Sequence, residues 1–356
     1  MKKRHIILSL IVLAAVLIYS QRASIALKIM PRAMENVMNS KVIEDLGEGL
    51  HLTLCGAGGP MPDPKRSGAC VVVVAGGKLY VVDAGTNGSR NLNRMRYPSG
   101  DIAALFLTHF HSDHIDGLGE MAMMRWVAGA NTSPLPVHGP EGVADVVDGF
   151  NDAYARDAVY RNDHHGDNVA PLSGTGMTAV SFPVPAEGES VVVYEQDGLK
   201  VEMIVVDHFP VTPAVAYLFS YQGRTVLISG DTAKSANIEK FAQGVDLLVH
   251  EALSPQLVNM MNATAKKVGN SILEKITHDI LDYHASPVEA AETARDADVG
   301  HLLYYHIVPP LIFPGAEAVW LEGVDEVFSD YTMGLDGTTF TLPPNSDEII
   351  KVRDAI

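Results

Sequence analysis

The chain has 356 residues, of which 47% are hydrophobic and 19% are charged, and its formal net charge is −17. This is a globular composition with enough apolar residues for one large domain or two modest ones. Because binding to a phosphate backbone needs a surface rich in lysine and arginine, the acidic balance predicts no nucleic-acid partner. Two cysteines, Cys55 and Cys70, permit at most one disulfide, and two buried thiols are the alternative.

The N-terminal segment combines basic residues with a short apolar run. Lys2-Lys3-Arg4 precede the apolar residues 6–19, which is the pattern of a secretory signal. A complete membrane span would need roughly 20 apolar residues. We therefore predict that residues 1–28 are a signal peptide or an uncleaved membrane anchor and that 29–48 are a linker or short helix. A signal peptide and a membrane anchor would both place the rest of the chain outside the cytoplasm, either in the periplasm or as a secreted protein. A first core helix is the alternative.

The next segment contains turn residues between apolar strands. A strand is predicted for residues 50–54, followed by the Gly- and Pro-rich loop 55–64 and a hairpin over 69–82 that turns at Gly76-Gly77. The loop leads into a strand and not into a helix, so it is not a nucleotide-binding fingerprint. Asp83 follows the hairpin, and by itself it could be a turn residue.

Three histidines and an aspartate lie within six consecutive positions after an apolar strand. The strand is predicted for residues 101–107, and His109, His111, Asp113 and His114 follow it. Imidazole and carboxylate groups suit a divalent transition metal, zinc above all. Two histidines two residues apart and an Asp-His pair cannot easily converge on one ion. The spacing therefore favours two adjacent ions.

A helix and an irregular insertion are predicted next. Residues 141–160 have apolar side chains at helical spacing, and residues 166–190 are rich in Gly, Ser and Pro. The segment 160–166 between them is predicted to be a loop that faces the cleft of the functional site. Its adjacent histidines, His164 and His165, point in different directions and are therefore candidates for substrate contact and not for joint metal binding.

Four further strands are each followed directly by polar residues. The strands are predicted for residues 198–206, 225–229, 245–249 and 299–305, and the residues that follow them are His208, Asp231, His250-Glu251 and His306. Strand ends that face the same edge of a sheet bring together groups that are distant in sequence. We therefore expect these side chains to lie near the histidine segment.

The motif His109-x-His111-x-Asp113-His114, with Ser-Gly-Asp231-Thr and His250-Glu251-Ala, resembles the metallo-β-lactamase-fold hydrolases. The resemblance covers roughly residues 49–343 and is closest to the branch with ribonuclease Z, cyclic-nucleotide phosphodiesterases and zinc-dependent arylsulfatases. It implies an α/β fold of the αββα type, with two mixed β-sheets packed face to face and helices outside. The fold would occupy residues 49–345, followed by a C-terminal tail at 346–356.

The resemblance also implies a site with two zinc ions, for which manganese or iron could substitute. His109, His111 and His208 would hold the first ion, Asp113, His114 and His306 the second, and Asp231 would bridge the two. Asp83 would orient the histidine segment by hydrogen bonds. The glycine-rich loop would border the site, with Arg66 as a candidate for substrate contact.

The implied reaction is hydrolysis of sulfate or phosphate esters of small molecules by a metal-bridging hydroxide. His284, in Tyr-His-Ala-Ser-Pro, resembles a catalytic histidine of ribonuclease Z and is the expected proton donor, with His250 and Glu251 in support. Asp113 is counted with the catalytic residues as well as with the ligands. A lactonase, a ribonuclease Z-type nuclease and a non-catalytic zinc-binding domain are the alternatives. The oligomeric state stays open, with a homodimer as one option.

Overall fold

The computed structural model describes residues 2–356, which divide into two compact units. Residues up to Asp45 form the first unit, and Leu46–Ile356 form the second. The first unit contains α1 (Lys2–Ser20), α2 (Arg22–Met38) and most of α3 (Val42–Leu46). Helix therefore covers most of the segment for which we expected a linker or a short helix.

The large apolar side chains of α1, from Ile6 to Tyr19, are exposed, each by more than half of its surface. Within the described residues, no single helix has both the length and the apolar composition to cross a membrane. The consecutive helical segments Arg4–Ser20 and Arg22–Met38, bent by 66°, meet these requirements together. Within the first unit, these apolar side chains do not form a core of their own.

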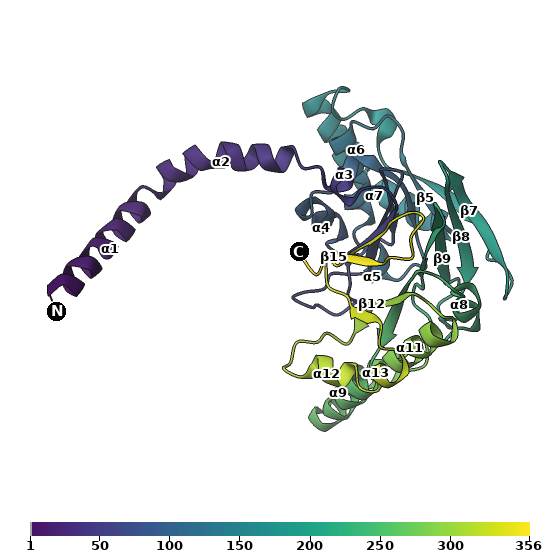
Figure 1. The fold of residues 1–356 in the computed structure, drawn as a ribbon. Coiled ribbons are helices and arrows are strands. Elements are labelled where there is room, and N and C mark those ends of the chain that lie inside the picture. The colour runs from purple at the N-terminus through teal and green to yellow at the C-terminus, as the bar shows by residue number, and fades with distance from the viewer. Residues whose placement is uncertain (1) are drawn as a thin grey trace. The chain divides into compact units, whose positions relative to one another are not determined.

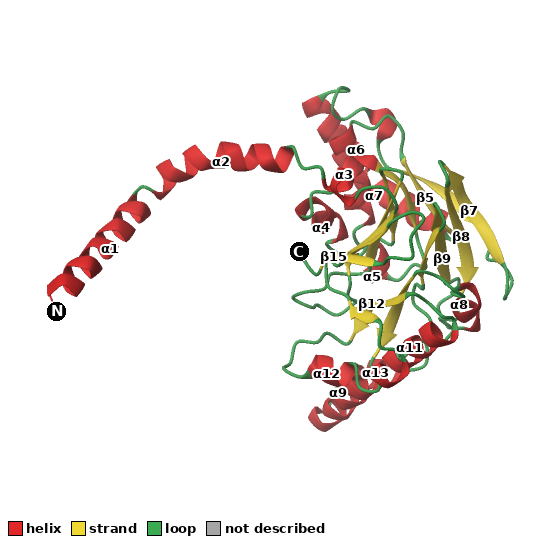
Figure 2. Cartoon of the chain, viewed as in Figure 1, coloured by secondary structure: helices red, strands yellow, loops and turns green. Residues whose placement is uncertain are grey.

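The second unit is built on two mixed β-sheets with helices outside, which confirms the predicted fold class (Figures 1 and 2). The first sheet contains, in spatial order, β15 (Ile350–Arg353), β14 (Thr339–Leu342), β1 (Leu50–Gly56), β2 (Cys70–Ala75), β3 (Lys78–Val82), β4 (Ile102–Phe106), β5 (Leu135–Pro140) and β6 (Met177–Phe182). The second contains β13 (Tyr331–Met333), β12 (His301–Val308), β11 (Leu247–Leu253), β10 (Arg224–Ile228), β9 (Val215–Tyr221), β8 (Leu199–Val205) and β7 (Ser190–Gln196).

The main core lies between the two sheets. Alternate side chains of a strand point to opposite faces, so Ala104 and Phe106 of β4 enter this core, where they meet Val201 and Phe219 of the second sheet. Phe106 packs edge-on against Phe219, with 5.6 Å between ring centroids. Such packing fixes the sheets against each other and thereby the loops at their edges.

Helices cover the outer faces of both sheets (Figure 1). Beside the first sheet lie α4 (Gly88–Arg94), α6 (Leu118–Gly129) and α7 (Val143–His165), and the short α5 (Ser112–Ile115) follows β4 at the end of the sheet. The later helices are α8 (Ala236–Phe241), α9 (Pro255–Val268), α10 (Ser271–Asp279), α11 (Pro287–Asp296), α12 (Ala316–Trp320) and α13 (Val324–Val327). Ile238 of α8 and Ala290 of α11 pack on the outer face of the second sheet. Two short 3-10 helices, η1 (Ser99–Asp101) and η2 (Leu172–Gly174), lie in the connections.

The structure bears on two predictions, one for the two cysteines and one for the C-terminal residues. Cys55 of β1 and Cys70 of β2 form a disulfide with a Cα–Cα distance of 5.0 Å, so the alternative of two thiols is wrong. The predicted C-terminal tail is also corrected, because residues 350–353 form β15 and pair with β14 at the edge of the first sheet. Short exposed segments that end a sheet lack a full apolar pattern, which is why the sequence did not reveal this strand.

Candidate metal centre

The candidate ligands meet where strands of both sheets end. His109 and His111 lie in the connection after β4, and His111 directly precedes α5, which carries Asp113 and His114. His208 follows β8, and Asp231 follows β10. Each side chain is therefore positioned by a buried strand or a tight turn beside one, as expected for ligand sites at sheet edges.

His306 lies inside β12, where the sequence predicted it just after a strand. The pairing register of β11 and β12 shifts between Glu251 and Ala252, which leaves His306 without a register partner. His306 adopts a left-handed backbone conformation, with φ of 45°. A bulge of this kind redirects one side chain without ending the strand. It turns His306 toward the centre.

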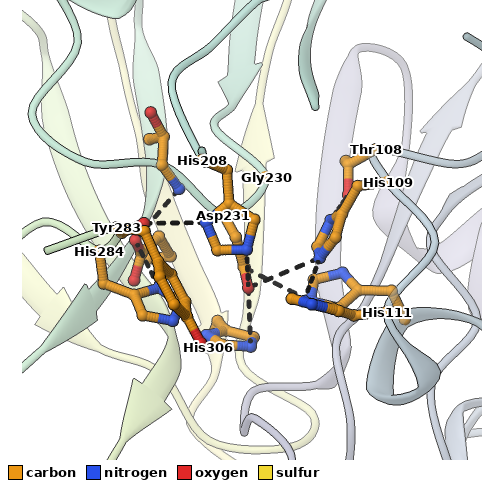
Figure 3. A network of polar contacts seen from close by, with 12 residues as sticks. Thr108, His109, His111, His208, Gly230, Asp231, Tyr283, His284 and His306 are labelled. Atoms are coloured by element: carbon orange, nitrogen blue, oxygen red, sulfur yellow. Dashed lines mark hydrogen bonds and ion pairs between the residues drawn. The ribbon is translucent and has the colours of Figure 1, made fainter. Parts of the chain in front are cut away.

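The seven predicted ligands fall into two groups of candidate ligand atoms. Figure 3 shows His109, His111, His208 and His306 around Asp231. The first group is His109, His111, His208 and Asp231, and the second is Asp113, His114 and His306. Within each group, the candidate ligand atoms lie within 4.8 Å of one another. A third group of this kind is Asp231, His284 and His306, so His284 is also a candidate ligand. The division into two ion sites stays a prediction.

Asp231 lies within reach of both groups. Its Oδ2 atom is 3.8 Å from His109 Nε2 and 3.4 Å from His306 Nε2, and its Oδ1 atom is 3.4 Å from His114 Nε2. These separations exceed good hydrogen bonds and match the spacing of two ligands around an ion bound at roughly 2.0–2.2 Å. The position suits a carboxylate shared by two cations.

Unpartnered atoms test whether the site suits a metal. Within the described chain, His114 Nε2, His208 Nε2 and Asp231 Oδ1 are buried and have no hydrogen-bond partner. Leaving a buried polar atom unpaired costs about 1–3 kcal/mol. Burial also lowers the pKa of His109 and of His208, which favours the neutral imidazoles that metals bind. The donor set therefore fits one or more divalent cations.

In His114 and His208, the ring nitrogen that faces away from the centre is held by a protein acceptor. Asp83 lies 2.8 Å from His114 Nδ1 and accepts hydrogen bonds from Thr108 N and Thr108 Oγ1, both at 2.8 Å. His208 Nδ1 donates to the carbonyl oxygen of Tyr283 at 2.8 Å. Such partners fix the tautomer and the ring orientation of a ligand. Asp83 thus has the contacts that its predicted orienting role requires.

The glycine-rich loop approaches the centre at Gly59. A Cβ atom added there would lie 3.0 Å from His306 Cε1 and 3.0 Å from a methyl carbon of Val308. Any larger side chain would push against a candidate ligand. This contact supports the expectation that the loop shapes the site.

His284 and Glu251 form a hydrogen-bonded pair at the rim of the centre. Glu251 Oε1 lies 3.0 Å from His284 Nδ1 and also accepts a hydrogen bond from Ala285 N at 3.1 Å. Burial lowers the pKa of His284, but the carboxylates of Glu251, Asp231 and Asp113 outweigh burial and raise this pKa to about 8. With Nδ1 held by Glu251, Nε2 is the ring nitrogen left for a substrate.

His250, also predicted as a site residue, does not line the cavity at the centre. It is completely buried, and its Nδ1 contacts the carbonyl oxygen of Glu251. Because neighbouring residues of a strand point to opposite faces, the orientation of Glu251 toward His284 turns His250 away. We therefore correct the expectation that His250 supports catalysis directly.

His164 and His165 are exposed at the C-terminal end of α7, because the helix continues to His165 through the segment predicted as a loop. Arg66 is buried, donates to the carbonyl oxygen of Gly334, and lies 3.5 Å from Asp63. It lines a different cavity from the one at the metal centre. None of these three side chains lines the cavity at the metal centre, and their contact with a substrate stays a prediction.

An apolar wall that we did not predict from the sequence lies beside the centre. A cavity of about 280 Å³ is bounded by candidate ligands and by Leu273, Ile276 and Thr277 of α10, together with Ile280. The signal was present, since these four positions have the i, i+3, i+4, i+7 spacing of one helix face. The helix is capped by Asn270, whose side chain accepts from Leu273 N at 3.0 Å.

Known proteins show the same fold and related sequences. A family model described as the β-lactamase superfamily domain matches residues 79–307. Ribonuclease Z of Mycolicibacterium gilvum (strain PYR-GCK) is 36% identical over 276 residues, covering 76% of this chain and 88% of that protein. Ribonuclease Z of Mycobacterium avium (strain 104) is 34% identical over 273 residues, covering 76% and 90%.

Two solved structures share the fold at low sequence identity. YhfI of Bacillus subtilis, a metallo-β-lactamase-fold protein, has a TM-score of 0.58 and 17% identity, covering 82% of this chain and 99% of its own. The short form of human tRNase Z has a TM-score of 0.57 and 19% identity, also covering 82% and 99%.

These relatives overturn one expectation. The net charge predicted no nucleic-acid partner, but the similar proteins are named as ribonucleases and a tRNase. Net charge describes the whole surface, whereas recognition of a nucleic acid depends on local groups. The prediction of no nucleic-acid partner was therefore wrong, because it used the net charge alone. With the family model covering most of the second unit and the ribonuclease Z relatives covering three quarters of the chain, this chain belongs to the metallo-β-lactamase-fold hydrolase superfamily.

Proposed function

We propose that this chain is a dinuclear-metal phosphodiester hydrolase. The observation that carries the proposal is the arrangement of seven side chains in two groups that share Asp231, with the His284–Glu251 pair beside them. A binding or scaffold domain needs no proton-donating pair at an open cavity. The names of the ribonuclease Z relatives favour phosphate diesters over sulfate esters and lactones.

The roles of the residues follow from their positions. His109, His111, His208 and Asp231 would hold one ion, and Asp113, His114 and His306, with Asp231, the other. Bound Zn²⁺ supplies Lewis acidity toward ester oxygens and activates water, and Mn²⁺ or iron suits a similar donor set. Asp83 keeps His114 in the tautomer whose Nε2 faces the centre.

His284 would donate a proton to the leaving oxygen through Nε2. Glu251 favours the protonated ring, because a carboxylate 3.0 Å from Nδ1 stabilises the imidazolium. The same carboxylate fixes the ring plane, so that the donated proton is aimed into the cavity. General acid catalysis of this kind contributes about 10²–10⁴ in rate.

A substrate panel tests the reaction. Purified zinc-loaded protein would be assayed on bis(4-nitrophenyl) phosphate, 4-nitrophenyl sulfate, a simple lactone and a 3′-extended tRNA, with and without a chelator. We expect chelator-sensitive turnover to be fastest on a phosphodiester. Preference for the sulfate or the lactone would replace the proposal with an arylsulfatase or lactonase assignment. A lack of chelator-sensitive turnover on every member would favour the zinc-binding scaffold.

We further propose that the second unit works outside the cytoplasm, held there or delivered by the N-terminal helices. Two observations support this location: the exposed apolar face of α1, and the Cys55–Cys70 disulfide, a bond that is rare in reducing compartments. A periplasmic reporter fused after residue 48 tests it. Export of the reporter is expected, and its retention in the cytosolic fraction would contradict the proposal.

A further inference from the structure

The lining of the cavity beside the metal centre combines polar and apolar side chains. The polar ones are the candidate ligands His111, Asp113, Asp231 and His306, with Ser112, Thr277, Tyr283 and His284. The apolar ones are Pro60, Met61, Leu273, Ile276, Ile280 and Val308. A substrate whose phosphoryl group lies at the ligands would therefore place one of its ester groups against the apolar side chains.

The apolar side chains are held in place by their own packing. Met61 and Ile280 pack against the small buried cluster of Leu253, Val258 and Val308. The wall therefore rests on side chains beneath it and not on a single loop.

Hydrogen bonds attach α10 to α9. Asn262 Nδ2 of α9 donates to Thr277 Oγ1 at 3.0 Å and to the carbonyl oxygen of Glu274 at 2.6 Å. Thr277 Oγ1 in turn donates to the carbonyl oxygen of Leu273 at 2.7 Å. These contacts fix α10 with Leu273 and Ile276 toward the cavity, so the surface is formed before a ligand arrives.

Apart from His284, whose proposed partner is the leaving oxygen, the cavity lining offers no cationic side chain for a charged ester group. Among the described lining residues there is no lysine or arginine, and the carboxylates are Asp113 and Asp231, both in the candidate ligand set. A charged group placed against Leu273 and Ile276 would lose its hydration without gaining an ion pair. The side chain of Ile276 is 50% exposed, so an apolar ligand can still bury part of it.

We infer that this cavity binds an apolar leaving group, aryl or branched alkyl, on the phosphodiester substrate. The inference rests on the proposed function for the position of the phosphoryl group. His284 borders the same cavity, and its proposed proton transfer goes to the leaving oxygen, which places the leaving group and not the other ester group beside α10. α10 is thus a specificity element of the site.

Binding of two phosphonates that are not hydrolysed tests the inference. Zinc-loaded protein would be titrated calorimetrically with phenylphosphonate and with methylphosphonate, which present the same charged head with and without an aryl group. We expect phenylphosphonate to bind on the order of tenfold more tightly or better, since each buried methylene-sized group contributes roughly fourfold. Equal affinities for the two ligands would overturn the inference.

Two variants on one helix locate the effect. Ile276→Ser should reduce the phenyl-to-methyl affinity ratio several-fold. Ile272→Ser is the matched control, because Ile272 is on the same helix, is 74% exposed, and does not line the cavity, so it should leave the ratio unchanged. An unchanged ratio in Ile276→Ser, or an equal loss in both variants, would contradict the assignment of α10.

Hydrolysis of methyl 4-nitrophenyl phosphate separates this inference from the proposed function. Chelator-sensitive turnover with no phenyl preference would retain the phosphodiesterase and remove the apolar pocket. A phenyl preference without turnover of any diester would retain the pocket and remove the phosphodiesterase. Both variants should keep the zinc content of the unaltered chain, because neither residue belongs to the ligand groups.

Discussion

The two halves of the chain supply the metal centre in different ways. The first half supplies His109, His111, Asp113 and His114 from one short connection after β4. The second half supplies His208, Asp231 and His306 singly, from β8, β10 and β12 or the turns beside them. A clustered contribution depends on local conformation, whereas a dispersed one depends on correct packing of a whole sheet. The centre is thus complete only when the second sheet is docked on the first.

The largest effect is expected at Asp231, where the two contributions meet. Asp231→Ala removes the carboxylate near both groups, so we expect less than one bound metal per chain and activity below about one per cent of the unaltered protein. Elemental analysis and the diester assay measure the two quantities. Asp207→Ala is the control, because Asp207 is exposed beside the same sheet edge and should retain both. Full metal content in Asp231→Ala would show that the halves bind their ions independently.

A substitution of His284 tests whether the second half of the chain also supplies the proton donor. His284→Ala should lower turnover about 10²–10⁴-fold on a diester with an alkoxide leaving group, and much less on a nitrophenyl ester, whose leaving group needs no proton. Metal content should stay unchanged, and kinetic assays with elemental analysis compare the two. Loss of metal would instead make His284 a ligand, since its ring also lies near Asp231 and His306.

A substitution of Asp83 tests whether its hydrogen bond to His114 supports metal binding by the 109–114 segment. Asp83→Asn keeps the shape but removes the negative charge beside His114 Nδ1, so we expect about 10–100-fold weaker metal binding. The group of Asp113, His114 and His306 should lose more affinity than the group of His109, His111 and His208. Titration against a competing chelator resolves the two affinities, and equal losses would remove the assigned role.

The smallest effect is expected at His138, a histidine of β5 outside the centre. Its Nδ1 lies 3.0 Å from the carbonyl oxygen of Val193, and burial lowers its pKa in the folded protein. The unfolded chain therefore binds the proton more readily, and folding stability contributed by the neutral ring is lost as the pH falls below about 6.5. One proton contributes at most about 1.4 kcal/mol per pH unit.

Urea denaturation at pH 7.5 and pH 5.0 measures this dependence. The unaltered protein should lose more stability across the interval than His138→Gln, which has no group titrating there. An identical loss in both proteins would show that His138 does not contribute to the pH dependence.

The same contrast between halves explains what could be predicted from the sequence. The fold class was predicted from strands that end in polar residues and from the family resemblance of the 109–114 motif. The sheet topology confirms the fold class, and the family model confirms the resemblance. The dispersed residues His208, Asp231 and His306 could be proposed because each follows an apolar strand. His306 required a bulge that no local pattern reveals.

Orientation and long-range packing set the limit of the prediction. His250 and Glu251 are neighbours in sequence, but the strand turns only Glu251 toward His284. Arg66 lies close in sequence to the loop that reaches His306, but its guanidinium is held by Gly334 and Asp63. The apolar wall of α10 has a readable helical pattern, but its position beside the ligands depends on the docking of α9 and α10 on β12. These features are determined by tertiary contacts and not by the residues' own sequence neighbours.

The C-terminal strand β15 has a consequence for handling the protein. It pairs with β14 through residues such as Lys351 and Arg353, and thereby occupies backbone groups of β14 that would otherwise be free to pair. An uncovered strand at a sheet margin recruits other chains into intermolecular pairing. Deleting residues 350–356 from a recombinant protein would therefore promote self-association through β14, although every residue of the metal centre would be intact.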